Sequence, residues 1–288
     1  MGIKLKAVWF AAATAAMLSC GSNTKEADDE WPDEELWTES DEQTDSLEVV
    51  PARQDTLLFT PTETLDGFFN DFLFAYLHSR KLRNERTATP LRLEHKERPA
   101  EILDDFDPEF EFSFLSGEYF TTLYGNNSQM QAEDDEELEE DSIVSLQRIN
   151  LNDGTIRNFQ FLRQEGRWTL EAIREATFDD DELNDFLHFY ARFCTDSAFQ
   201  NQSIANPLHI VLQYADDGEE SVDGTIDADQ WQTFCPEVPS GIVSNIRKGQ
   251  HYSGNRVILR KSGLSNGLQD IFTFTKDRNG WHLSEYEN

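Results

Sequence analysis

Thiols and positive charge are both scarce in this chain of 288 residues. It has three cysteines, and its 24 lysines and arginines stand against 56 aspartates and glutamates, which gives a formal charge of −32. Such a field repels phosphate backbones and anionic lipid headgroups, which argues against nucleic acid as a partner. The sequence contains no Cys-x-x-Cys pair and no histidines at short metal-ligand spacing. We therefore expect neither a metal site nor a cofactor.

The apolar run near the N-terminus is too short to span a bilayer. Residues 7–18 are mostly apolar or small, Lys4 and Lys6 precede them, and Ser19 and Cys20 follow. A spanning helix needs about 20 residues, whereas this pattern is typical of a secretory signal. Residues 17–20 resemble a bacterial lipobox, with Met where Leu is usual. The resemblance implies that residues 1–19 are removed and that Cys20 carries the lipid; a plain secretory peptide with an incidental cysteine is the alternative.

An acidic segment follows the signal. Residues 21–50 contain 12 acidic residues and one lysine, with few apolar side chains to offset the entropy of ordering. We predict a solvated tether over residues 20–56. Residues 25–30 resemble the acidic export tag of Bacteroidetes lipoproteins that are carried to the outer face. A charged spacer facing the periplasm is the alternative, so we expect an outer-membrane lipoprotein and leave its orientation open.

The remaining chain contains an internal duplication. Residues 69–76 match residues 183–190 at an offset of 114, and eight further pairs lie at one offset of 113. A fixed offset between similar segments indicates one structural unit built twice. We predict two domains, residues 57–175 and 176–288, each of ordinary domain size. The eight pairs are Val144/Val257, Leu146/Leu259, Leu151/Leu264, Gly154/Gly267, Phe159/Phe272, Phe161/Phe274, Trp168/Trp281 and Leu170/Leu283.

Each copy begins with helical spacing and ends with strand-like alternation. In the first copy, apolar residues recur every three or four positions over 65–76, which would leave Asp66 and Asp71 nearer water. Residues 110–114, 143–149 and 158–162 alternate as strands do. In the second copy, we predict helices over 183–194 and 197–205, and strands near 210–214, 256–261, 270–275 and 281–286. Helices followed by a meander of strands indicate an α+β fold.

This order of elements resembles the nuclear transport factor 2-like (cystatin-like) cone. Both copies, and residues 186–207 in particular, are similar to a family of unknown function found in Bacteroidetes lipoproteins. The resemblance covers residues 57–288 and implies two tandem cone-like α+β domains, each with N-terminal helices packed on a curved antiparallel sheet. Because this fold carries isomerases, dehydratases, hydrolases and binding modules, it does not assign an activity.

The candidate catalytic residues lie on the repeated helix. Enzymes with this cone move protons with a carboxylate or a His-Asp pair, so Asp185 and His188 are candidate bases and Tyr190 a candidate donor. Asp71 recurs with Asp185, but both lie off the apolar stripe, and His188 is replaced by Phe74 in the first copy. The alternative is a solvated helix face for Asp71 and Asp185 and a surface or boundary histidine for His188.

Aromatic residues supply candidates for a pocket lining. Trp168 and Trp281 close equivalent strands and could stack on a flat ligand, and Tyr76, Tyr190 and Trp231 are further candidates. The alternative for the repeated Trp168 and Trp281 is that they are core residues.

Cys194 and Cys235 are the thiols left after lipidation. In an oxidising compartment they can form a disulfide that closes a loop of about 40 residues, worth about 3 to 4 kcal/mol. A free core thiol at Cys194 is the alternative.

Three functions remain open at this point. The favoured hypothesis is a lipid-anchored, non-catalytic binding module for a small molecule, a glycan or an envelope protein. The alternative is an isomerase, dehydratase or hydrolase that uses one cone pocket. A third hypothesis treats the domains as spacers in a surface assembly. An open, polar pocket inside one cone would favour the enzyme, and two filled cones would exclude it.

Overall fold

The computed structural model describes residues 65–115, 117, 119–134, 142–213, 221–234, 236–249, 252, 254–263 and 268–288. All of them belong to one compact unit. The predicted signal, Cys20 and the tether lie outside the described residues, as does Cys235. Within the described ranges, no helix combines the length and the apolar character needed to cross a membrane.

The first copy contains four α-helices, a short 3-10 helix (η1, Ser113–Leu115) and six strands among its described residues. The helices are α1 (Phe69–His78), α2 (Arg80–Glu85), α3 (Pro108–Glu111) and α4 (Asn127–Asp134). The strands are β1 (Thr87–His95), β2 (Glu101–Leu103), β3 (Tyr119–Tyr124), β4 (Ile143–Asn150), β5 (Thr155–Gln164) and β6 (Arg167–Thr177).

The second copy repeats this order after the 3-10 helix η2 (Phe178–Asp180). Its helices are α5 (Asn184–Thr195), α6 (Ser197–Gln202), η3 (Ala228–Gln230) and α7 (Trp231–Phe234). Its strands are β7 (Ile204–Gln213), β8 (Ser221–Ile226), β9 (Ile242–Arg247), β10 (Arg256–Gly263), β11 (Gln269–Asp277) and β12 (Gly280–Glu287). The α+β fold class is confirmed.

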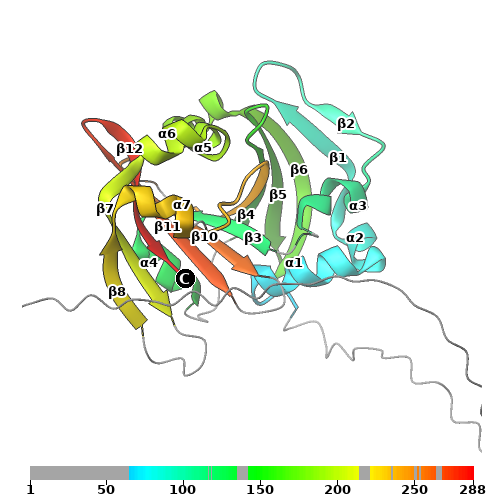
Figure 1. Cartoon of the computed structure of the whole chain (residues 1–288). Coiled ribbons are helices and arrows are strands. Elements are labelled where there is room, and N and C mark those ends of the chain that lie inside the picture. Colours follow the sequence, from blue (N-terminus) through cyan, green and yellow to red (C-terminus); the bar gives the residue numbers. More distant parts are fainter. Residues whose placement is uncertain are drawn as a thin grey trace, which may run out of the picture. The chain divides into compact units, whose positions relative to one another are not determined.

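The strands form two six-stranded sheets that exchange one strand. Sheet A has the order β2-β1-β6-β5-β4-β9 and sheet B the order β3-β10-β11-β12-β7-β8. Strand β9 belongs to the second copy in sequence but pairs with β4, and β3 belongs to the first copy but pairs with β10. Figure 1 shows the two sheets, with sheet A on the right and sheet B on the left. Apart from these two strands, sheet A is built from residues 87–177 and sheet B from residues 204–287.

The exchanged strands β3 and β9 meet at Thr121 and Ser244, which occupy equivalent positions in the two copies. Thr121 pairs with Lys261 and Ser244 pairs with Arg148, and these partners occupy matching positions in the two copies. The Thr121 amide donates to Ser244 Oγ (2.8 Å) and the Ser244 amide donates to Thr121 Oγ1 (2.9 Å). Each hydroxyl also donates to the other residue's carbonyl, at 2.7 and 2.9 Å. Four reciprocal hydrogen bonds thus join the edges of the two sheets and leave neither edge open for pairing with another chain.

Each sheet packs its concave face on the repeated helix. In sheet A, α1 lays Phe69, Phe72 and Tyr76, all fully buried, against Phe161 and Trp168. In sheet B, α5 does the same with Phe186, Tyr190 and Phe193 against Phe274. The three- and four-residue spacing of the rings produces this single apolar stripe.

A buried ion pair closes the base of the first cone, where we had expected a solvated carboxylate. Asp66 is 3% exposed and accepts two hydrogen bonds from Arg86, at 3.0 and 2.8 Å. It accepts a third from the Trp168 amide at 3.0 Å. The prediction that Asp66 lies near water was wrong, because residue spacing does not show that Arg86 approaches the carboxylate from elsewhere in the chain. In the second copy, Ser203 occupies the position of Arg86, since both carbonyls accept from equivalent leucine amides.

Two predicted elements differ in the structure. Residues 110–114 are not a strand, because Asp107 caps α3 through the amides of Glu109 and Phe110, and Pro108 occupies its first turn. Phe112 instead packs on Phe159 in the core. The predicted helix over 197–205 ends at Gln202, and β7 begins at Ile204.

Replacing Thr121 with valine keeps the side-chain shape but removes its two hydrogen bonds to Ser244, one donated and one accepted. We expect a loss of about 1 to 3 kcal/mol for each buried group left unpaired, and the Thr121→Val/Ser244→Ala double variant should lose less than the sum. Urea unfolding measures this. Thr225→Val, at an exposed position of β8, should change stability by less than about 0.5 kcal/mol. Equal losses of unfolding free energy for Thr121→Val and Thr225→Val would contradict a stabilising role for the contact between Thr121 and Ser244.

Removing Asp66 leaves the Arg86 guanidinium buried without its carboxylate. We expect Asp66→Ala to lose about 3 to 5 kcal/mol, and Asp66→Ala/Arg86→Met to recover part of that loss. Asp71→Ala, on the exposed face of α1, serves as the control and should cost less than about 1 kcal/mol. Thermal and urea unfolding measure the loss of stability in each variant. Similar losses for Asp66→Ala and Asp71→Ala would refute the buried ion pair.

Candidate functional site

The aromatic pocket candidates fill the two cores. Tyr76 and Trp168 are fully buried, and Tyr190 and Trp231 are 1% and 2% exposed. Trp281 is partly buried and packs against the second core, with its ring 5.2 Å from that of Phe186. A ligand would have to displace these packed rings to enter either cone.

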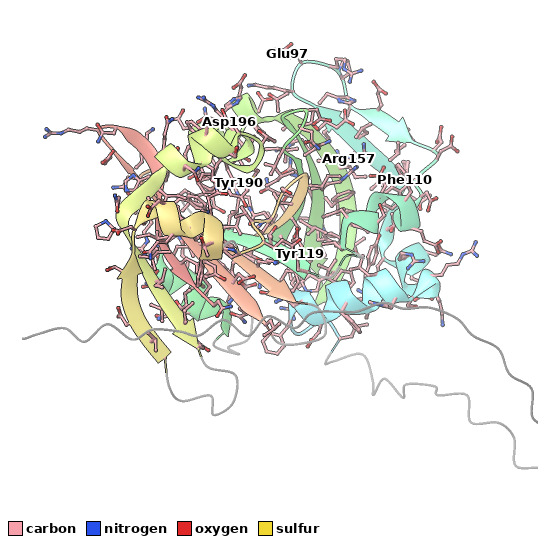
Figure 2. The ribbon with its side chains drawn as sticks, viewed as in Figure 1. Glu97, Phe110, Tyr119, Arg157, Tyr190 and Asp196 are labelled. Atoms are coloured by element: carbon pink, nitrogen blue, oxygen red, sulfur yellow. The ribbon has the colours of Figure 1, made fainter. Side chains whose placement is uncertain are left out.

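The candidate catalytic residues are not brought together. The Asp185 carboxylate accepts a hydrogen bond from Lys276 Nζ at 2.6 Å, which lowers the pKa of Asp185, and its side chain is 68% exposed. His188 is exposed and contacts Asp179 at 2.8 Å. Tyr190 points the other way, into the core beneath α5 (Figure 2), and its hydroxyl donates to the Pro239 carbonyl at 2.7 Å. Burial raises the pKa of Tyr190 far above its ordinary value, so this hydroxyl remains protonated.

Cys194 is a free cysteine in the structure, and its sulfur lies 3.4 Å from the same Pro239 carbonyl. Burial raises the pKa of the Cys194 thiol to about 12. Because Cys235 lies outside the described residues, the bond between the two stays a prediction.

A groove on the outer face of sheet A is a cavity of about 890 Å³. We call it the sheet A groove. The strands contribute Glu94, Ser145, Asn158, Gln160 and Arg174, and the loop after β1 contributes Lys96. Its opposite wall comes from the second copy through Asp180, Asp181 and Arg247. A smaller cavity of about 420 Å³ adjoins it and shares Glu175, Ala176 and Asp180.

The lysine and arginines that line the groove are paired with carboxylates. Arg174 contacts Glu94 at 3.0 Å, and Arg247 contacts Glu182 at 2.7 Å and Asp181 at 3.3 Å. Lys96 reaches across from the first copy and bonds Asp180 of the second. This hydrogen bond lowers the pKa of Asp180 to about 2 and raises that of Lys96.

A chain of charged side chains adjoins the groove. His95 Nδ1 lies 3.2 Å from Glu175, and Arg157 joins Glu175 (3.0 Å) to Glu111 (2.8 Å). Burial raises the pKa of Glu111 in spite of the nearby arginine. Figure 2 labels Arg157 on β5 and Glu97 on the loop that joins β1 to β2. The arrangement can position a polar ligand, and no group of side chains in the described ranges could hold a metal ion.

An amide network connects the groove to the strand crossing. Gln147 donates to Asn158 at 2.7 Å and accepts from Asn245 at 2.8 Å, and the Asn245 carbonyl oxygen accepts from the Leu123 amide at 2.9 Å. Sequence analysis did not identify the groove residues. A signal was available: at the offset of 113, Ser145, Asn158 and Gln160 align with Ile258, Ile271 and Thr273.

Comparison with known proteins agrees with this fold. A family model described as "Domain of unknown function (DUF4348)" matches residues 53–288. Among solved structures, the chain is similar to an NTF2-like protein from Bacteroides fragilis, with 30% sequence identity and a TM-score of 0.69. That match covers 79% of this chain and 98% of the other. No curated protein matches. The predicted resemblance to an NTF2-like Bacteroidetes family of unknown function is confirmed.

With a pKa of about 12, the Cys194 thiol has a negligible thiolate fraction at pH 8. We expect iodoacetamide to leave Cys194 unmodified in the folded protein and to alkylate it fully in urea without reductant, as peptide mass spectrometry would show. Alkylation in urea only after reduction would mean that the disulfide with Cys235 forms. Fast alkylation of the folded protein would contradict the burial of the thiol.

Proposed function

The chain belongs to the DUF4348 family of domains of unknown function, and on this premise we propose that it is a lipid-anchored cell-envelope protein that binds a ligand without transforming it. In this proposal Cys20 carries the lipid, the acidic segment 20–56 is the tether, and the protein is an outer-membrane lipoprotein.

One observation carries the proposal. In the part of the chain that the structure describes, packed aromatic side chains fill both cone interiors, where enzymes of this fold keep their chemistry, whereas the sheet A groove is open. Cores at crystal-like density have no room for a substrate. A cavity of about 890 Å³ is within the range of small-molecule binding sites.

The anchor is supported by the sequence. The short apolar run, the small residue before Cys20 and the acidic segment after it form the order typical of an exported lipoprotein. The acidic run at residues 25–30 also resembles the export tag of Bacteroidetes lipoproteins.

The alternative, an enzyme that uses one cone, requires Tyr190 to meet a substrate. Its hydroxyl is already bound to the Pro239 carbonyl, and its ring stacks on Phe186 and Phe193. Catalysis would need this cluster to open.

Replacing Cys20 with serine removes the sulfur to which the lipid is attached. We expect the native protein to stay with membranes during carbonate extraction and Cys20→Ser to move to the soluble fraction, as immunoblots of fractions from the expressing bacterium would show. Cys194→Ser is the matched control and should remain with the membrane. A soluble native protein, or a Cys20→Ser variant that is still membrane-bound, would refute the anchor.

Mass spectrometry can separate binding from catalysis. We expect the mature protein, incubated with a small-molecule and oligosaccharide extract of the envelope, to retain compounds whose masses match those in the extract. New product masses that disappear in Tyr190→Phe would instead establish the enzyme.

A further inference from the structure

The outer face of sheet A carries polar residues at two places where the equivalent face of sheet B carries isoleucine. Ser145 and Asn158 of the first copy align with Ile258 and Ile271 of the second. Ile258 is fully buried. Since the same structural unit accepts isoleucine at these places, folding alone does not require the polar residues. Polar groups kept where a fold permits apolar ones are typical of functional sites.

The groove also contains an uncommitted amide. Asn158 is held by Gln147, but the half-buried side-chain amide of Gln160 forms no hydrogen bond within the described part of the chain. It presents two donors and one acceptor oxygen at the groove. A ligand can engage this amide without breaking a contact of the fold.

Charge in the groove favours a neutral ligand. Lys96, Arg174 and Arg247 are each paired with a carboxylate. An anion could contact one of these cations only by displacing the carboxylate that is already bound to it. The chain's formal charge of −32 further disfavours anions. Ion pairs of this kind keep free lone pairs and N–H groups at their edges, which suit hydroxyl groups that both donate and accept.

Small apolar surfaces lie among these polar groups. Ile143, 60% exposed, and Ala100 and Ala176 line the same groove. A sugar ring has the matching character, because its C–H face is apolar and its hydroxyl edge is polar. The volume of about 890 Å³ accommodates one or two such rings.

We propose that the sheet A groove binds a neutral, hydroxyl-rich molecule of the sugar class through Gln160, Asn158 and the paired charges around them. The inference rests on the proposed function, for which it names the ligand class. Replacing Gln160 should therefore affect ligand binding and leave folding unchanged.

Calorimetry on the mature chain would test this. The probes are maltose, cellobiose and mannobiose at about 10 mM, with glucose 6-phosphate and glucosamine as charged counterparts. We expect a neutral disaccharide to bind and both charged sugars to bind more weakly. Gln160→Ala should weaken binding about tenfold while leaving the melting temperature within about 2 °C, because no protein hydrogen bond is lost. Ser145→Ile, which places the second copy's residue in the groove, should abolish binding by occupying space.

Thr225→Ile, on exposed β8, is the matched control and should bind as the native protein does. Unchanged affinity in both groove variants would place the sugar elsewhere and overturn the groove while leaving the binding function intact. Tighter binding of a charged sugar would overturn the neutral class. If none of the three disaccharides bound, the inference would be overturned. A soluble native protein in the membrane fractionation would instead contradict the proposed lipid anchor and leave this inference untouched.

Discussion

The reciprocal contact between Thr121 and Ser244 is the constraint on which the architecture depends. Because each side chain bonds the other's backbone, two edges that would otherwise be exposed become one continuous junction. Strand β9 completes sheet A, and β3 completes sheet B. The Asn245 amide then extends this junction to Gln147, and through it to Asn158 in the groove. The groove is therefore linked by hydrogen bonds to the junction of the two sheets.

The two copies differ in where they place charged residues. The first copy buries Asp66 against Arg86, whereas the second has Ser203 at the arginine's position. On the outer faces, Ser145 and Asn158 of the first copy stand where the second has Ile258 and Ile271. A buried ion pair is weak evidence of added stability, because removing two charges from water offsets most of their attraction. The two copies thus share a fold and differ in the polar contacts that each has added to it.

Sequence analysis predicted the cores well and the site poorly, for physical reasons. The apolar spacing over residues 65–76 and 183–194 predicted both helices, because helical periodicity is local. Residues 110–114 were misassigned because the Asp107 cap outweighs two-residue alternation. The strand exchange could not be read from the sequence, because alternation within a strand does not show which strand it pairs with. Asp66 depends on partners 20 and 102 residues away, and the charged groove residues Lys96, Arg174 and Arg247 on partners 65 to 84 residues away. Spacing carries no record of such contacts.

Strand exchange has a consequence for the order in which the polypeptide matures. The register of β4 on β9 joins Asn150 to Ile242, so sheet A lacks its last strand until most of the second copy has been synthesised. Contacts so distant in sequence slow the search for the native state, and a half-synthesised chain leaves β4 as an unpaired edge. A chaperone that shields such an edge would therefore act in the interval between the synthesis of the two copies.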